Sequence, residues 1–264
     1  KNLDINVTDS DGNNGLIIAT KKGNMAIVEL LIKHKININA VNKDGKNALV
    51  IALELKNEEI ATLLINEKIK LPIQGFRDDK NLLGLSVSMS NVFHLLVSLG
   101  QDINYVTYQD LNLLHCACSE TDDISVFECI LKNMKHDINA TTIYNQTALI
   151  TACIFNRSIG VLDLLLKNGA IVEIKDYENK TALTYAIEKK NGSIVKKLFE
   201  YFEDKKDVLV KELSNINLTE EDLKYYDAFY SLLFKLIKVG GYKGKLRSEA
   251  IKTRNVILLK KLLS

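Results

Sequence analysis

The residues of this chain whose types could do chemistry together are His115, Cys116 and Cys118. An imidazole beside two thiols could ligate zinc, or it could activate a cysteine as a nucleophile. The spacing argues against both, because the chain has no C-x-x-C pair and no H-x-x-x-H. What these side chains do therefore depends on the elements that hold them.

A second candidate is the glycine-rich stretch 240–245, GGYKGK. It is one residue short of G-x-x-x-x-G-K-[ST], and Leu246 stands where Ser or Thr would ligate magnesium. The paired acids at 58–59 and 220–221 fall at predicted helix starts, where the helix dipole favours them. We predict no catalytic residue, no metal and no cofactor from these patterns.

The elements that hold these residues form a repeated pattern. Stretch 145–173 contains a short helix pattern, a polar break and a second helix with apolar residues at i, i+3 and i+4 spacing. The pattern recurs at six leucines, spaced by 33, 34, 31, 35 and 34 residues: Leu16, Leu49, Leu83, Leu114, Leu149 and Leu183. A period in this range predicts stacked helix-turn-helix repeats.

Two further positions follow the same register. Three residues after each leucine stands a small residue: Ala19, Ala52, Ser86, Ala117, Ala152 and Ala186. Four residues before each leucine stands a residue that tolerates positive φ, as the tip of a tight turn requires: Gly12, Gly45, Asp79, Asp110, Asn145 and Asn179. The register gives Cys118 and Cys153 the same position, four residues after the leucine, so we predict that the cysteines are structural.

The chain resembles the ankyrin-repeat family, whose signature is T-P-L-H-x-A followed by a leucine-rich second helix. The matching segments are 147–149 (TAL), 181–183 (TAL), 114–117 (LHCA) and the linker 137–140 (DINA). No opening contains the proline, and only His115 keeps the histidine. The resemblance implies an all-α ankyrin-repeat solenoid with hairpin fingers, and a hydrogen-bonding role for His115 in its opening turn.

The register predicts one continuous solenoid domain of six repeats: 8–40, 41–72, 73–105, 106–140, 141–174 and 175–202. Residues 1–7 match the closing linker of an earlier repeat, so we expect a fragment of a longer protein. After 202 the period fails. We predict a helical insertion at 203–245, then a degenerate terminal repeat at 246–264 that aligns with the sixth repeat at a constant offset.

Composition narrows the classes of partner. The chain has 264 residues and a formal net charge of +2, which gives no reason to expect nucleic acid or an anionic membrane surface as partner. No apolar run approaches the roughly 18 residues of a membrane span. The thiols are predicted to be reduced, and in a secreted protein the seven N-x-S/T triplets would risk glycosylation. Both features favour an intracellular, cytoplasmic setting, in a host cell if the protein is a pathogen effector.

The resemblance implies that fingertips and first helices line a concave groove. Six residues before each leucine stand Ser10, Lys43, Arg77, Tyr108, Ile143 and Tyr177, and the adjacent column contains Tyr144. Tyrosine and arginine are enriched at interface hot spots. We predict that a protein partner contacts Lys43, Arg77, Tyr108, Tyr144, Phe155 and Tyr177. The alternative is that the tyrosines lie along their own hairpins.

The predicted function is that of a non-enzymatic scaffold, assumed monomeric, that binds an unknown protein partner. The alternative is a regulatory or targeting segment of a kinase, a ubiquitin-ligase adaptor or a host-directed effector, whose activity lies elsewhere. An enzyme formed by 203–245 is disfavoured, because that stretch has no cysteine or histidine.

Overall fold

The computed structural model describes residues 4–72 and 81–201. These residues form twelve α-helices and no β-strand, so the all-α prediction is confirmed for this part of the chain. The chain divides into two compact units, Lys1–Lys135 and His136–Ser264. The predicted insertion at 203–245, the terminal repeat at 246–264 and the site residue Arg77 all lie outside the described residues.

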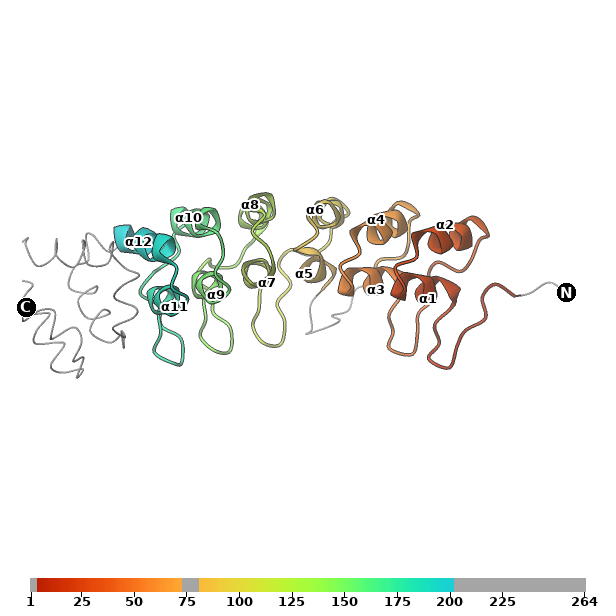
Figure 1. The fold of residues 1–264 in the computed structure, drawn as a ribbon, viewed down its shortest axis with the longest axis horizontal. Coiled ribbons are helices and arrows are strands. Elements are labelled where there is room, and N and C mark those ends of the chain that lie inside the picture. Colours follow the sequence, from red (N-terminus) through yellow and green to blue (C-terminus); the bar gives the residue numbers. More distant parts are fainter. Residues whose placement is uncertain (1–3, 73–80, 202–264) are drawn as a thin grey trace, which may run out of the picture. The chain divides into compact units, whose positions relative to one another are not determined.

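Unit 1 contains eight of the helices: α1 (Gly15–Lys21), α2 (Met25–Lys33), α3 (Ala48–Glu54), α4 (Glu58–Asn66), α5 (Leu82–Ser86), α6 (Ser90–Ser98), α7 (Leu113–Glu120) and α8 (Ile124–Asn133). Consecutive helices pack as pairs, α1 with α2 through α7 with α8. The odd-numbered helices also pack on one another in order, and so do the even-numbered helices. Unit 1 therefore has two layers of helices (Figure 1).

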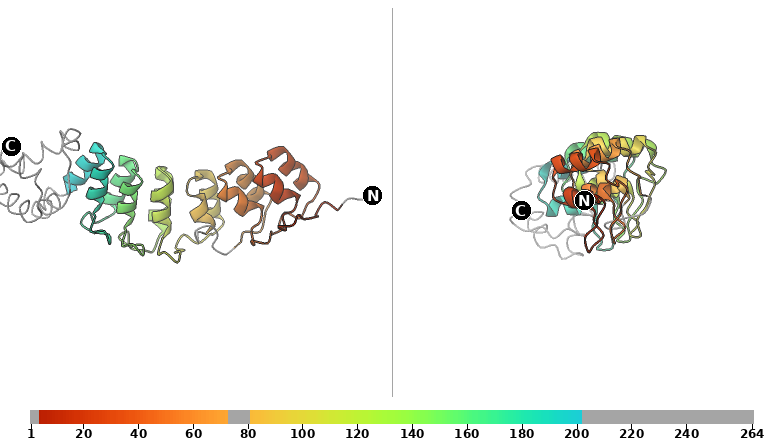
Figure 2. Two further views of the ribbon diagram at one scale, coloured as in Figure 1. Left: turned by 60° about the horizontal axis from the view of Figure 1, so that its bottom comes forward. Right: turned by 90° about the vertical axis from the view of Figure 1, so that its right-hand side faces the viewer.

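Unit 2 repeats the arrangement with four helices: α9 (Ala148–Ile154), α10 (Ile159–Lys167), α11 (Ala182–Glu188) and α12 (Gly192–Tyr201). Here α9 pairs with α10 and α11 with α12, while α11 stacks on α9 and α12 on α10. In each unit the loops before the first helices extend away from the second-helix layer (Figure 2).

Side-chain caps start the first helix of each pair. Asparagine is the cap of α1, α3, α5 and α7, and threonine is the cap of α9 and α11. The Asn14 side chain, for example, accepts a hydrogen bond from the Ile17 amide at 3.0 Å and donates one to the Asn37 carbonyl at 3.1 Å. Asparagine thus begins the helix and also fixes the linker that follows the pair.

The core of unit 1 lies between the two helical layers and between successive pairs. Each second helix contributes a side chain that is completely buried: Val28, Ala61, Phe93 and Phe127. Burial of a valine or phenylalanine side chain stabilises a fold by about 1.5–3 kcal/mol. Small residues in the first helices, such as Ala52 and Ala117, are buried too and allow the helices to approach closely. The same apolar columns that define the sequence period therefore define the core.

Asparagine also joins successive linkers. The Asn6 side chain accepts a hydrogen bond from the Asn37 amide at 2.7 Å, and Asn39 accepts one from the Lys70 amide at 2.7 Å. Equivalent bonds run from Lys135 to Asn104 at 2.7 Å in unit 1 and from Ile171 to Asn139 at 2.8 Å in unit 2. Each bond spans about one sequence period, so it fixes the register between neighbouring pairs within a unit.

Candidate functional site

His115 is buried in the first turn of α7, where it caps the helix. Its backbone amide donates to the Asn112 side chain at 3.1 Å, and its Nδ1 accepts from the Asn112 amide at 3.3 Å. This reciprocal pair satisfies two amides that a helix start leaves without partners. The prediction that His115 stabilises its opening turn by hydrogen bonding is confirmed.

The cysteines have the environment of core residues. Cys116, Cys118 and Cys153 are buried, Cys129 is half-buried, and none forms a disulfide. Burial raises the pKa of the Cys153 thiol to about 12 and raises the pKa of Cys129 as well. A thiol must ionise to attack or to bind metal, so these two are poor nucleophiles at neutral pH. Within 4–72 and 81–201, no three His, Cys, Asp or Glu side chains gather where they could hold a metal ion.

A serine, a histidine and an aspartate that sequence reasoning missed meet at the start of α8. The His94 Nε2 lies 3.1 Å from the Ser125 hydroxyl, which donates to the Asp123 carboxylate at 2.7 Å. A catalytic triad needs the carboxylate to orient the histidine, whereas Asp123 here accepts from the serine and from its amide. The group is exposed, and Asp123 is the helix cap, so the arrangement serves the start of α8.

The loops before the first helices form fingers with one shared hydrogen-bond pattern. In each described finger, one side-chain oxygen at the finger's first residue accepts the amides two and four residues later, and the fingers are 9–13, 42–46, 107–111, 142–146 and 176–180. The fourth residue of each has positive φ: Gly12, Gly45, Asp110, Asn145 and Asn179. The predicted left-handed turn is confirmed at these five positions, and the sixth, Asp79, lies outside the described residues.

Backbone hydrogen bonds join neighbouring fingers within each unit. In unit 1 the Lys43 amide donates to the Asp11 carbonyl at 2.9 Å, and in unit 2 the Tyr177 amide donates to the Tyr144 carbonyl at 3.2 Å. The Asn145 side chain adds a bond to the Lys175 carbonyl at 2.6 Å. The tips of fingers 142–146 and 176–180 are therefore held next to each other.

The structure brings together only some of the predicted site residues. Tyr144 and Tyr177 stand on the two joined fingers of unit 2 and are 56% and 77% exposed. Tyr108, on finger 107–111 of unit 1, is 69% exposed, and Lys43 on finger 42–46 is also exposed. Phe155 is exposed too, but it ends α9 and so lies at the opposite end of that helix from its finger. Ile143, which was not predicted as a contact, is exposed beside Tyr144.

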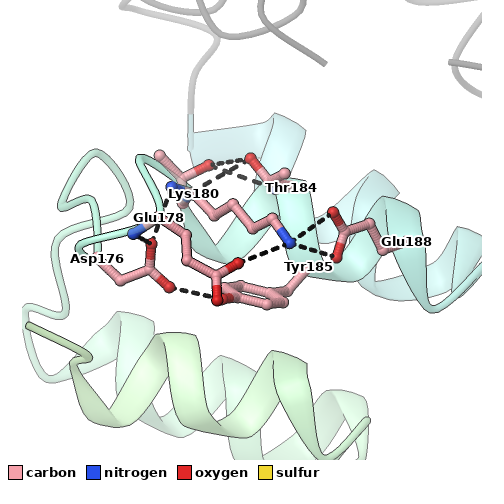
Figure 3. Close-up of polar contacts among 7 residues, drawn as sticks. Asp176, Glu178, Lys180, Thr184, Tyr185 and Glu188 are labelled. Carbon is pink, nitrogen blue, oxygen red and sulfur yellow. Dashed lines mark hydrogen bonds and ion pairs between the residues drawn. The ribbon is translucent and has the colours of Figure 1, made fainter. Parts of the chain in front are cut away.

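A polar network holds finger 176–180 against α11 (Figure 3). The Asp176 carboxylate accepts the Tyr185 hydroxyl at 2.6 Å, while Lys180 pairs with Glu178 and Glu188 at 3.1 Å each and lies over the Tyr185 ring. Burial, and then the Asp176 carboxylate, raise the pKa of the Tyr185 hydroxyl well above its ordinary value. Hydrogen bonds to Glu178 and Glu188 raise the pKa of Lys180. The network keeps the base of this finger rigid while its tip stays exposed.

Comparisons with known proteins found one family profile and solved structures that are similar to this chain. The sequence profile of ankyrin repeats, in a form that holds three copies, matches residues 1–75 and 114–211. Among solved structures, this chain is similar to a chain of the complex between the predatory endopeptidase Bd0816 of Bdellovibrio bacteriovorus and immunity protein Bd3460. That match has a TM-score of 0.58 at 25% identity and covers 74% of this chain and 99% of the other. No curated protein matches the chain.

Proposed function

The chain belongs to the ankyrin-repeat family, and we propose that it is a non-enzymatic scaffold that binds a protein partner through its fingers. The ankyrin fold is in general an interaction module without catalysis. No helix within 4–72 and 81–201 combines the length and the apolar character that crossing a membrane requires. We propose a cytoplasmic monomer that needs no cofactor, with six repeats stacked as one solenoid.

One observation carries the proposal: two tyrosines stand on adjacent fingers whose backbones are bonded together. Tyr144 and Tyr177 are more than half exposed, although each could bury about 150–250 Å² of surface. Both tips are fixed before a partner arrives, because their amides and the Asn145 side chain are already bonded. Binding therefore costs little ordering entropy. Exposed, rigid tyrosines are the typical anchors of a protein interface.

The partner would extend from these tyrosines along the concave groove of the solenoid. The proposed contacts are Lys43, Arg77, Tyr108, Tyr144, Phe155 and Tyr177. We place the strongest contacts at Tyr144 and Tyr177, with Ile143 filling the apolar surface beside them. Phe155, at the far end of α9, would contact only a partner that runs the length of that helix. The structural match to a complex of an endopeptidase with an immunity protein is consistent with a protein partner.

The experiment is affinity purification of the chain from cells of its source, compared with a Tyr144→Ser/Tyr177→Ser variant. We expect a specific partner that the double variant loses, since removal of two hot-spot tyrosines weakens binding by roughly 100-fold or more. Ile159→Ser is the matched control, because Ile159 is an exposed apolar residue of α10, outside the fingers. If the double variant retains every partner at wild-type yield, the proposed site is wrong.

A second candidate is that the chain is the regulatory or targeting segment of a kinase, a ubiquitin-ligase adaptor or a host-directed effector. The complete reading frame distinguishes the candidates: a catalytic or adaptor domain in the same frame would favour the second.

A further inference from the structure

The third helical pair of unit 1, α5–α6, has a shorter connection than the two pairs before it. Helices α2 and α4 begin nine residues after the leucines Leu16 and Leu49, whereas α6 begins seven residues after Leu83. Helix α5 has five residues, and α1 and α3 have seven each. The turns of the first two pairs contain a residue with positive φ, Gly23 and Lys56, and turn 87–89 contains none. The α5–α6 connection is therefore two residues shorter and closes differently.

Ser88 lies in this short turn with an unpaired hydroxyl. Its Oγ is buried, and within the described residues it makes no hydrogen bond. A buried hydroxyl without a partner has lost its bonds to water and has gained none in exchange. The unpaired group therefore lowers the stability of the folded turn.

Helix α6 begins without the side-chain cap of the second helices before it. Met89 stands at its cap position and makes no side-chain cap bond, whereas Asn24 and Asn57 cap α2 and α4. Loss of a cap shifts a folding equilibrium by roughly fivefold. The start of α6 is tied to α4 only through an exposed side-chain bond, which Asn91 donates to Glu58 at 2.9 Å.

Helix α5 is weakened in its interior as well. Its third residue is Gly84, at a position where α1, α3 and α7 have the buried side chains of Ile17, Val50 and His115. Glycine loses more backbone entropy on folding than any other residue, and here it also contributes no side chain to the core. The other apolar side chains of α5 and α6 are buried much as those of α3 and α4 are. The difference between the two pairs thus comes from backbone and polar groups.

An ion pair spans the short turn. The Lys56 ammonium, in the turn of α3–α4, lies 3.1 Å from the Glu120 carboxylate at the end of α7. These residues belong to the pairs on either side of α5–α6, because α5 packs on both α3 and α7. The flanking pairs therefore have a direct contact that does not pass through α5–α6. Lys56 is mostly exposed, so this contact adds little to stability.

We propose that α5–α6 is a conformational weak point of unit 1, which unfolds locally and reversibly while α1–α2 and α3–α4 stay folded. Each pair of the stack contacts its neighbours, so opening of an interior pair uncouples the pairs on its two sides. Unit 1 thus has a built-in point of flexion between α4 and α7. Partner binding is not required for it, because the observations are turn length, capping and burial alone.

The first test is amide hydrogen exchange of the whole chain under native conditions. We expect the amides of α5 and α6 to exchange roughly tenfold or more faster than those of α3 and α4. Their exchange should also depend less on added urea, because a local opening exposes less surface than global unfolding. Equal protection and equal urea dependence in the two pairs would overturn the proposal.

Two matched variants separate local opening from unfolding of the whole unit. Ser88→Ala removes the unpaired hydroxyl of the short turn, and exchange in α5 and α6 should slow by roughly fivefold. Thr20→Val removes the hydroxyl of α1 that is likewise buried and unpaired within the described residues. It should slow exchange in α1 and leave α5 and α6 unchanged, because α1 stays folded when α5–α6 opens. If Thr20→Val slows α5 and α6 as much as Ser88→Ala does, or if Ser88→Ala has no effect there, the weak point does not exist.

Discussion

The first two fingers of unit 1 differ at their tips from the fingers of unit 2, although their backbones are held in the same way. The third described finger of unit 1, 107–111, has the exposed Tyr108 at its tip and resembles those of unit 2. Small polar or charged side chains occupy the tips of fingers 9–13 and 42–46: Ser10, Asp11, Lys43 and Asp44. Large apolar or aromatic side chains occupy three of the four equivalent positions of fingers 142–146 and 176–180, Ile143, Tyr144 and Tyr177, and Glu178 occupies the fourth. In both units the side chain of the finger's first residue accepts hydrogen bonds from the amides two and four residues later. The bond between neighbouring fingers also joins the same two positions.

The difference separates what the fold requires from what it leaves free. The first and fourth residues of a finger are restricted, because one must accept two amides and the other must adopt positive φ. The two tip residues between them carry no such requirement, since lysine and tyrosine occupy the same position in different fingers. Exposed aromatic tips in unit 2 are therefore not explained by the fold, and the proposed contact with a partner would explain them.

The largest expected effect comes from Asp176, which is buried and also accepts a hydroxyl from the helix that follows its finger. Asp176→Ala removes the acceptor of two amides and of the buried Tyr185 hydroxyl. We expect the free energy of unfolding to fall by about 2–4 kcal/mol. The matched variant Asp9→Ala removes the acceptor of two amides and of the Asn13 side chain, but Asp9 is exposed, so this variant should lose clearly less in the same urea titration. Equal losses would show that the buried network adds nothing.

Tyr185→Phe tests the same network through pH. At pH 7 the variant should be less stable by about 2 kcal/mol, because Asp176 loses a charge-assisted hydrogen bond. The folded-state pKa of Tyr185 is raised, so its contribution is complete below the unfolded pKa of about 10 and is lost as pH rises above it. The stability gap between wild type and variant should therefore shrink above pH 10. A gap that is constant from pH 7 to pH 11 would contradict the assignment.

A smaller effect is expected at Thr142, which has the same role in finger 142–146 without the extra network. Thr142→Val removes the acceptor of the Tyr144 and Gln146 amides, at 3.2 and 3.4 Å, and keeps the shape of the side chain. We expect a loss of about 1–2 kcal/mol in urea unfolding. Thr142→Ser is the control and should restore most of it. If Thr142→Val unfolds like wild type, the shared finger pattern is not a source of stability.

The smallest effect on stability is expected at the tips themselves. Tyr144→Ser/Tyr177→Ser and Lys43→Ser/Asp44→Ser should each change the free energy of unfolding by no more than about 0.5 kcal/mol. These side chains are exposed, and each finger's backbone bonds do not depend on them. Thermal melts of both variants check this. A large loss in the tyrosine variant alone would mean that the tyrosines lie along their own hairpins and support the fold.

Much of the fold could be predicted from the sequence because the repeat places equivalent residues at equivalent positions. The turn at Asn145 was predictable because local chemistry restricts it, and the role of His115 was predictable because it stands at the family's histidine position. The asparagine caps at Asn14 and Asn47 were missed, although asparagine stands two residues before the leucine of each early repeat. The repeated asparagine was therefore a signal in the register, although the family's signature has a threonine at this position.

The Asp176–Tyr185 network was not predictable in the same way. Its two residues lie on different elements, and their bond depends on how finger 176–180 packs on α11. The grouping of Tyr144 with Tyr177 was predicted from adjacent positions of neighbouring fingers, and the backbone bond between these fingers gives it a physical basis. Whether Lys43, Tyr108 and Phe155 join them depends on the path of a partner, which the register does not encode.

The most direct measurement is amide hydrogen exchange on the chain with and without its purified partner. We expect protection to increase at residues 143–145 and 177–179, and to stay unchanged at 10–12 and in helix α10. Protection confined to the fingers of unit 1, or to the second helices, would contradict the claim that the aromatic fingertips of unit 2 form the binding surface.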